Sequence, residues 1–128
     1  MDNISLRAVG YRRVSMREQV DGFSLDAQEN NIRKYAEDHG WEVMGVYTDA
    51  GISAKRDSER PQLIQLMEDA EAHKFDVVIV DKIDRFYRHL GGLLNALDRL
   101  KEDNVFFVSV QERLDFTTPW GKLTLTVL

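Results

Sequence analysis

The sequence predicts an α/β fold, in which an open, mostly parallel sheet of four to five strands carries helices on both faces. Two observations predict it across 128 residues, a length typical of one domain. Segments rich in β-branched and aromatic residues alternate with segments that have apolar residues at helical spacing. The run "DVVIV" at 76–80 is apolar from its second residue on, as in a parallel strand covered on both faces. The order β-α-β-α-β-α-β follows.

The first half of the chain predicts two strands with a helix between them. The first strand is expected over Leu6–Val14, and the second over "WEVMGVYTD" at 41–49. The helix begins after Ser24, a typical N-cap residue, and runs to about His39. Gly40 follows, where a left-handed residue commonly ends a helix. The core-facing residues of this helix are Leu25, Ile32 and Ala36.

The second half predicts two more strands and two more helices. A loop of small and charged residues leads to Pro61, which suits the first position of a helix that ends at about His73. The strand at 76–80 precedes a helix from about Leu90 to Glu102 and a strand, "VFFVSV", at 105–110. Thr118 and Pro119 are typical of a further helix start. The inward positions of the two helices are Leu63, Leu66, Met67 and Ala70, then Leu93, Leu94, Leu97 and Leu100.

Composition excludes several classes of protein. No cysteine is present, so neither a disulfide framework nor a thiolate zinc site is expected. The N-terminus lacks the apolar core of a signal peptide, and no run of about 18 apolar residues predicts a membrane span. We therefore expect a soluble, cytoplasmic protein with no membrane partner. The formal net charge of -5 disfavours a nucleic-acid partner only weakly, because it says nothing of local clusters.

Charged side chains follow the predicted strands at the points where those strands end. In an open parallel sheet, ligands bind beyond the carboxyl ends of the strands. Because neighbouring strand residues point to opposite faces, only one of Arg12 and Arg13 can face such a site, and Arg13 shares its face with Tyr11 and Ser15. The residues expected to gather there are Arg13, Ser15, Asp49, Arg60, Asp81, Asp84, Arg85 and Arg88.

Several arginines around one hydroxyl suit phosphoryl transfer without a metal ion. A guanidinium is always charged, and its planar fork of donors matches the oxygens of a phosphate group. Such groups would bind a phosphodiester and stabilise its transition state, and losing one contact typically costs roughly 3–4 kcal/mol of barrier. His39, His73 and His89 lack the spacing of a metal site.

Taken one at a time, these residues have structural interpretations. Arg13 alone is typical of a surface position, and Asp49 of a turn. Asp84 alone is typical of a helix N-cap that pairs with Arg88 at i, i+4. Their joint occurrence favours a site.

Five motifs occur in a fixed order: "YRRVS", "GFSLDAQ", "YTDAGISA", "SERPQL" and "DKIDRFYR". In these motifs the chain resembles the catalytic domain of the serine recombinases, the resolvase–invertase group. It is most similar to the large serine integrases and the transposon site-specific recombinases. The resemblance runs from Tyr11 to about Val127.

The resemblance implies a role for each matching residue. It implies that Ser15 is the nucleophile that attacks a DNA phosphodiester and becomes joined to the 5′-phosphate. It implies that arginines surround this phosphate, namely Arg13, Arg85 and Arg88, with Arg60 as a further active-site arginine. The acidic and supporting positions that it implies are Asp49, Asp84, Tyr11, Gln19 and Gln28.

The resemblance also implies partners and a domain organisation. It implies a reaction on double-stranded DNA with no metal or nucleotide cofactor, carried out by homodimers that assemble into a synaptic tetramer. It implies an origin in a bacterium, a phage or a mobile element. Relatives continue along a long helix into DNA-binding domains, and "KLTLTVL" at 122–128 has no C-terminal cap. We therefore expect residues 1–128 to be the N-terminal catalytic domain, truncated near the start of that helix.

Three other functions remain as alternatives. A magnesium-dependent nuclease would use Asp81 and Asp84 as metal ligands. A receiver-type regulatory domain needs further acids after the first strand, where Arg13 and Ser15 stand, and a nucleotide-binding module needs a glycine-rich turn after a strand. In a recombinase, the group that activates Ser15 stays open. Clustered arginines would lower the pKa of the Ser15 hydroxyl, and Asp49 or Asp84 would accept its proton or only orient the arginines. No histidine is placed for a triad.

Overall fold

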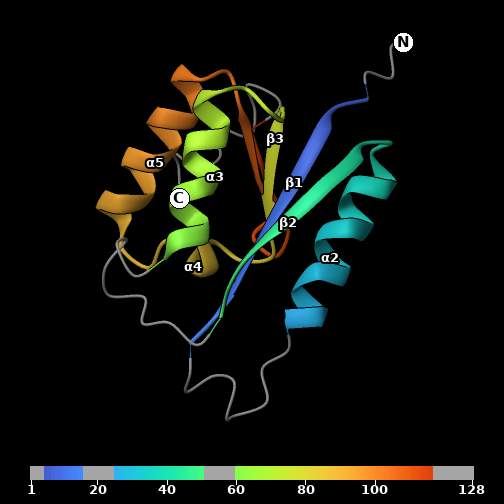
Figure 1. The fold of residues 1–128 in the computed structure, drawn as a ribbon. Coiled ribbons are helices and arrows are strands. Elements are labelled where there is room, and N and C mark those ends of the chain that lie inside the picture. The colour runs from blue at the N-terminus through green and yellow to red at the C-terminus, as the bar shows by residue number, and fades with distance from the viewer. Residues whose placement is uncertain (1–4, 16–24, 51–59, 117–128) are drawn as a thin grey trace.

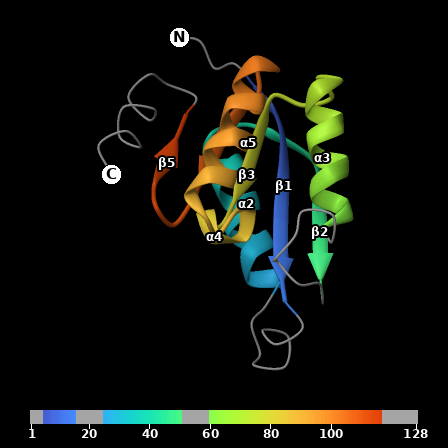
Figure 2. The same ribbon diagram turned by 90° about the vertical axis from the view of Figure 1, so that its left-hand side faces the viewer.

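Five strands form a single sheet in the order β2-β1-β3-β4-β5. The structure is a computed structural model that describes residues 5–15, 25–50 and 60–116. β1 is parallel to β2 and β3, and β3 to β4, whereas β5 is antiparallel to β4 at the edge (Figure 2). The predicted mostly parallel sheet is confirmed. The strands are β1 (Arg7–Val14), β2 (Glu42–Ala50), β3 (Val77–Val80), β4 (Phe106–Ser109) and β5 (Leu114–Asp115).

Helices cover both faces of the sheet, as the sequence predicts. α2 lies on one face, and α3 and α5 lie on the other (Figure 1). The short α4 follows β3 directly, at the end where the parallel strands finish. No helix in the described ranges combines the length and the apolar character that crossing a membrane requires. The helices are α2 (Leu25–Asp38), α3 (Pro61–Glu71), α4 (Ile83–Phe86) and α5 (Leu90–Glu102).

Each face of the sheet has its own apolar core. The strand residues alternate between the two cores, because successive side chains of a strand point to opposite faces. The core between the sheet and α2 consists of Ala8, Ile32, Ala36, Val77, Ile79 and Val108. The larger core between the sheet and the α3–α5 layer includes Val9, Tyr11, Leu63, Leu66, Val78, Phe86, Leu93 and Phe107.

Gly10 allows α2 to lie close against β1. A Cβ atom at Gly10 would lie 2.8 Å from Cγ2 of Ile32, closer than real Cβ contacts come. The missing side chain therefore sets the distance between α2 and the sheet. This packing brings Gln28, one helical turn before Ile32, next to the end of β1.

Several details of the helices were predictable and others were not. Pro61 begins α3, and Gly40 has a left-handed φ of 71°, as predicted. The prediction that Leu94 faces the core is wrong, because this residue is 44% exposed. Ala96 is buried instead. A helix turns by about 100° per residue, so a stripe through 93, 96 and 100 leaves 94 outside it. The predicted cap at Ser24 and the helix start at Thr118 and Pro119 lie outside the described residues.

The segment after β3 contradicts the structural interpretation of Asp84. α4 begins at Ile83, and its N-cap is Lys82, which makes no side-chain capping hydrogen bond. The helix ends at Phe86, so Arg88 is not part of it and no i, i+4 pair forms along this helix. A four-residue helix is too short to show a period in the sequence, which is why its bounds were missed.

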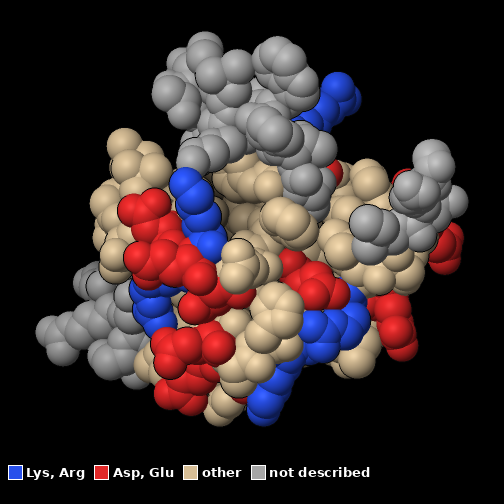
Figure 3. Space-filling view, turned by 90° about the horizontal axis from the view of Figure 1, so that it is seen from above, with Lys and Arg blue, Asp and Glu red and all other residues tan. Residues whose placement is uncertain are grey.

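At the opposite end of the sheet, where the parallel strands begin, an ion pair joins β1 to the start of β3. Asp76 accepts hydrogen bonds from Arg7 N at 2.8 Å, Arg7 Nε at 3.1 Å and Arg7 Nη2 at 3.2 Å. His73 Nε2 lies 3.4 Å from the same carboxylate. Figure 3 looks onto this end and shows acidic and basic side chains next to one another.

Candidate active site

β1 ends with two arginines that reach opposite faces of the sheet. Arg12 Nε donates to Thr48 Oγ1 at 2.8 Å, and Arg12 Nη1 lies 2.8 Å from Glu29 Oε1 on α2. Arg13 reaches across to α4 instead. Arg13, rather than Arg12, therefore contacts the segment after β3, and its place in an active site stays a prediction.

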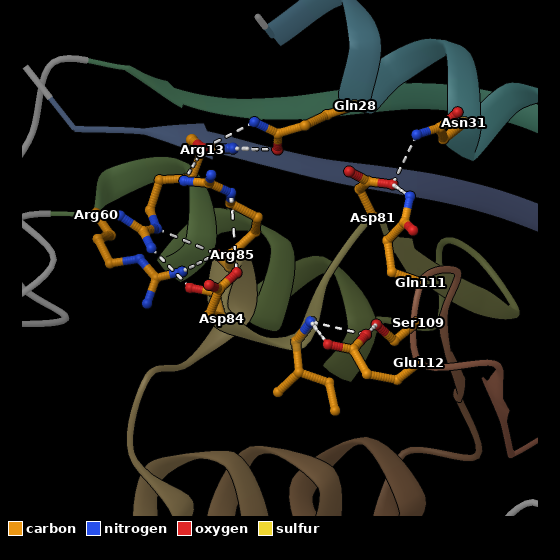
Figure 4. Close-up of polar contacts among 11 residues, drawn as sticks. Arg13, Gln28, Asn31, Arg60, Asp81, Asp84, Arg85, Ser109, Gln111 and Glu112 are labelled. Atoms are coloured by element: carbon orange, nitrogen blue, oxygen red, sulfur yellow. Dashed lines mark hydrogen bonds and ion pairs between the residues drawn. The ribbon is translucent and has the colours of Figure 1, made fainter. Parts of the chain in front are cut away.

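Arg13 is buried against main-chain oxygen atoms. It is 1% exposed, and it donates from Nε to Arg85 O at 3.2 Å and from Nη2 to Asp84 O at 2.7 Å (Figure 4). Within the described part of the chain, its Nη1 is buried and has no hydrogen-bond partner. Buried charges are normally paired with an opposite charge. Among the described residues, Arg13 therefore retains an unused donor and has no carboxylate within ion-pair distance.

Arg60 lies between two aromatic rings just before α3. Its guanidinium carbon is 5.3 Å from the ring centroid of Tyr11 and 5.3 Å from that of Tyr87. Its Nε donates to Tyr11 Oη at 3.2 Å, and its Nη2 donates to Arg85 O at 2.9 Å. Only 2% of the residue is exposed. Arg85 O thus accepts from both Arg13 and Arg60, which fixes the two guanidinium groups close together.

Asp49, at the end of β2, caps α3 from outside the helix. Its carboxylate accepts from Gln62 N at 3.1 Å and Leu63 N at 3.0 Å, and from Tyr11 Oη at 2.8 Å. A carboxylate satisfies the unpaired N–H groups of a helix N-terminus and the positive end of its dipole. Burial raises the pKa of Tyr11 well above its usual value, so the phenol stays a donor to Asp49. Asp49 is 1% exposed, and its carboxylate already accepts three hydrogen bonds.

α4 and the residues after it supply the rest of the cationic cluster. Arg85 is 8% exposed, and its Nη1 lies 3.4 Å from Arg13 O. The side chain of Asp84 is 60% exposed, with its carboxylate 3.9 Å from Arg85 Nε. Arg88 is exposed two residues past the end of α4.

The pKa of Arg13 is affected by the other arginines of the cluster. Its pKa is lowered chiefly by burial, then by the positive charge of Arg60, and further by Arg88 and Arg85. The Tyr11 side chain opposes this shift. Four guanidinium groups from three separate segments therefore share one electrostatic environment. Such a cluster favours a bound anion, and the guanidinium fork matches phosphate best.

Gln28 holds the end of β1 in place. Its Oε1 accepts from Arg13 N at 3.2 Å, and its Nε2 donates to Arg13 O at 3.1 Å (Figure 4). The side chain is buried, and both of its polar atoms are used by the main chain of Arg13. Gln28 therefore fixes the end of β1, and Ser15 follows that strand directly.

Ser15 lies directly after β1 and is partly exposed. It follows Arg13 by two residues, so the chain itself keeps it at the edge of the cluster. Its role as a nucleophile stays a prediction, as do the roles of the residues around it. Gln19 lies outside the described residues.

Asp81, at the end of β3, faces away from the arginine cluster. Its Oδ1 accepts from Asn31 Nδ2 at 2.9 Å and Gln111 Nε2 at 3.0 Å (Figure 4). It is joined to neutral amides, while Asp84 lies beside Arg85, so the two acids do not form a shared ligand set for magnesium. No group of three or more His, Cys, Asp or Glu residues suited to a metal occurs in the described ranges.

Sequence reasoning missed several contributors to this region. Tyr87 lies inside the "DKIDRFYR" motif, but only the fold shows that its ring covers Arg60. The carbonyl oxygens of Asp84 and Arg85 leave no sequence signal, because every residue has one. Glu112 contacts the start of α4 and Ser109 donates to Glu112, but both residues lie far along the chain and have no motif of their own.

Comparisons with known proteins agree with the sequence resemblance. The family model described as "Resolvase, N terminal domain" matches residues 8–128. The chain is 32% identical over 126 residues to a Sinorhizobium fredii protein named "Probable DNA-invertase y4cG", covering 98% of this chain and 37% of that protein. The chain thus spans well under half the length of this curated relative.

Two solved structures share the fold. The N-terminal catalytic domain of TP901-1 integrase is 38% identical with a TM-score of 0.83, and the match covers 94% of this chain and 89% of that chain. A resolvase family site-specific recombinase from Streptococcus pneumoniae is 31% identical with a TM-score of 0.81, covering 96% and 83% of the two chains.

Proposed function

Because the chain belongs to the resolvase family of serine recombinases, we propose that it is the catalytic domain of a site-specific DNA recombinase. Its substrate is the phosphodiester backbone of double-stranded DNA, which it cleaves and rejoins. The observation that carries the proposal is the cluster of buried guanidinium groups at the end of β1, the strand that Ser15 follows, and within the described residues Arg13 Nη1 is a buried donor with no partner.

In the proposed cleavage step, Ser15 Oγ attacks a backbone phosphorus and loses its proton. The new Oγ–P bond replaces the P–O3′ bond, so the protein becomes joined to the 5′-phosphate and the departing 3′ oxygen takes up a proton. The reverse attack by a 3′-hydroxyl rejoins a strand and releases Ser15. One phosphodiester is exchanged for another, so no nucleotide is consumed.

The arginines supply the positive charge that this reaction needs. The phosphoryl group gains negative charge in the transition state, and donors fixed in advance in a buried site stabilise it most strongly. Arg13 and Arg60 are fixed by main-chain and aromatic contacts, and Arg85 lies against Arg13. These contacts support a reaction that proceeds without a metal ion.

The contacts of the two acids separate their proposed roles. Asp49 accepts three hydrogen bonds in a buried position, which supports a positioning role for it rather than the removal of the Ser15 proton. Asp84 is exposed and has room to accept a proton. We therefore assign removal of the Ser15 proton to Asp84 rather than to Asp49.

The whole protein is proposed to be longer than this chain and to act as an assembly. Residues 1–128 are then the N-terminal catalytic domain, followed by a long helix and DNA-binding domains. Two homodimers bind two DNA sites, form a tetramer and exchange strands. Integration, resolution and inversion share this chemistry and differ in the sites joined.

The first prediction is that Ser15→Ala in the full-length protein abolishes cleavage while DNA binding persists. The variant removes the attacking oxygen and leaves the arginine cluster intact. The measurement is the formation of a covalent protein–DNA adduct on a labelled recombination site, followed by peptide mapping of the attached residue.

Two controls make this test specific. Arg85→Lys keeps a positive charge but lacks the guanidinium fork, so we expect an intact DNA complex with cleavage slowed about 100-fold or more. Adduct formation by the unmodified protein is measured with and without EDTA. Persistent cleavage by Ser15→Ala, or complete loss of cleavage in EDTA, would contradict the proposed chemistry.

A further inference from the structure

The N-terminus of α4 is capped by a side chain from the turn between β4 and β5. Both carboxylate oxygens of Glu112 lie 3.3 Å from Ile83 N, the first residue of α4, and Ser109 Oγ donates to Glu112 Oε1 (Figure 4). The first N–H groups of a helix have no partner within that helix. Lys82, the N-cap residue, supplies no side-chain acceptor, so Glu112 takes that place.

The two residues before Glu112 are held by main-chain contacts to the end of β3. Between β4 and β5, Val110 N donates to Val80 O at 3.0 Å and Gln111 N donates to Asp81 O at 2.9 Å. Ser109, which contacts the Glu112 carboxylate, is fully buried. Glu112 therefore stands in a turn whose first two residues are hydrogen-bonded to the end of β3.

α4 is the element on which the arginine cluster is built. Its residues Asp84 and Arg85 provide the carbonyl oxygens that accept from Arg13 and Arg60. Arg85 also contributes its own guanidinium. A shift of α4 would move three guanidinium groups together, and a misplacement of about 1 Å in an active site typically costs about 100-fold in rate.

We infer that Glu112 is a positioning residue for the phosphate site, acting through the hydrogen bond to Ile83 N, with Ser109 orienting its carboxylate. This inference rests on the proposed function for its catalytic readout. Glu112 touches neither the arginines nor Ser15 in the contacts described above. Its effect on cleavage passes through the main chain of α4.

The test compares Glu112→Ala, Glu112→Gln and Glu37→Ala in the full-length protein. Glu37 is an exposed residue on α2 and serves as the matched control. Alanine removes the acceptor, whereas glutamine keeps one oxygen to accept from Ile83 N and an amide that can donate to Ser109 Oγ. Single-turnover adduct formation is measured well below the unfolding temperature of each variant.

We expect Glu112→Ala to slow adduct formation about 10- to 100-fold and Glu112→Gln to stay within about threefold of the unmodified protein. A residue that only stabilises the fold would lower the unfolding temperature without slowing cleavage by the folded protein. Cleavage by Glu112→Ala at the unmodified rate, or equal losses in the alanine and glutamine variants, would overturn the inference.

Hydrogen exchange separates this inference from the proposed function. Amide exchange over residues 83–86 should become faster in Glu112→Ala and stay unchanged in Glu37→Ala. This readout needs no DNA, so it holds even if Ser15 forms no adduct. Unchanged exchange in Glu112→Ala would refute the positioning role, while absence of any adduct in the unmodified protein would refute the proposed function.

Discussion

The two ends of the parallel sheet each hold an arginine of β1, but the two arginines have different partners. At the amino end, Arg7 is matched by the carboxylate of Asp76 through three hydrogen bonds. At the carboxyl end, Arg13 is matched by the main-chain oxygens of Asp84 and Arg85. In the described part of the chain, Arg13 has no carboxylate within ion-pair distance.

The pKa values of these residues shift in opposite directions for this reason. The hydrogen bond to Asp76 raises the pKa of Arg7. Burial and the neighbouring arginines lower the pKa of Arg13. Carbonyl dipoles orient a cation without neutralising it, whereas a carboxylate does both. The amino end therefore holds a structural ion pair, whereas no carboxylate of the described residues neutralises Arg13 at the carboxyl end.

The largest expected effect tests this difference directly. Arg13→Lys keeps the positive charge but replaces the guanidinium with one ammonium group on a flexible side chain. The guanidinium contacts two carbonyl oxygens and still has Nη1 available, and an ammonium group cannot do both. We expect cleavage to fall about 100- to 1000-fold, because a fixed donor to the transition state is lost. The measurement is single-turnover cleavage by the full-length protein.

Arg12→Lys is the matched control, because Arg12 is the neighbouring residue and faces α2. Its cleavage rate should stay within about threefold of the unmodified protein, because its partly buried contacts are to Thr48 and Glu29 rather than to the arginine cluster. If both lysine variants cleave equally well, the assignment of Arg13 to the phosphate site is wrong.

Much of the fold could be predicted because the main elements carry strong periodic signals. The buried run of β3 and the apolar stripe of α3 follow from residue type alone. α4 and β5 were missed because four and two residues are too few to show a period. Their positions depend on tertiary contacts, such as the pairing of Leu114 with Ser109.

The candidate site was predictable in its residues but not in its contacts. Strand ends and motif order pointed to Arg13, Arg60 and Arg85, since parallel strands finish at one edge. The sequence could not show that Asp49 caps α3, or that Glu112 contacts Ile83, because these pairs are brought together only by the fold.

The next effect in size concerns Asp49, the buried acid of the carboxyl end. Asp49→Asn removes a charge that accepts from Gln62 N and Leu63 N, and it places an amide where only acceptors are needed. We expect unfolding free energy to fall by about 2 kcal/mol, the usual range for a buried charge-assisted hydrogen bond. Urea denaturation at pH 7 measures it.

Asp84→Asn is the control for stability, because its side chain is 60% exposed. Its unfolding free energy should change by less than about 0.5 kcal/mol, as for most surface substitutions. Equal destabilisation by the two variants would show that Asp49 does not hold α3 in the way its contacts indicate.

The smallest effect belongs to the amino end and depends on pH. Hydrogen bonding to Arg7 is the main cause that lowers the pKa of Asp76, and burial opposes it. A carboxyl whose pKa is lower in the folded state stabilises the fold above its unfolded pKa, which is about 3.9 for Asp. This stabilisation disappears as the pH falls through the folded pKa. Asp76→Asn should therefore cost about 1 kcal/mol at pH 7, since the ion pair is partly exposed.

The difference between Asp76→Asn and the unmodified protein should be constant above about pH 5 and shrink as the pH falls below about 4. Because His73 also faces Asp76, the same comparison is made in a His73→Gln background, where the acidic decline should persist. Cleavage should be unaffected, since Arg7 and Asp76 lie at the far end of β1 from Arg13. A difference that grows in acid, or a loss of cleavage, would show that the two ends of the sheet do not have the separate roles that their partners indicate.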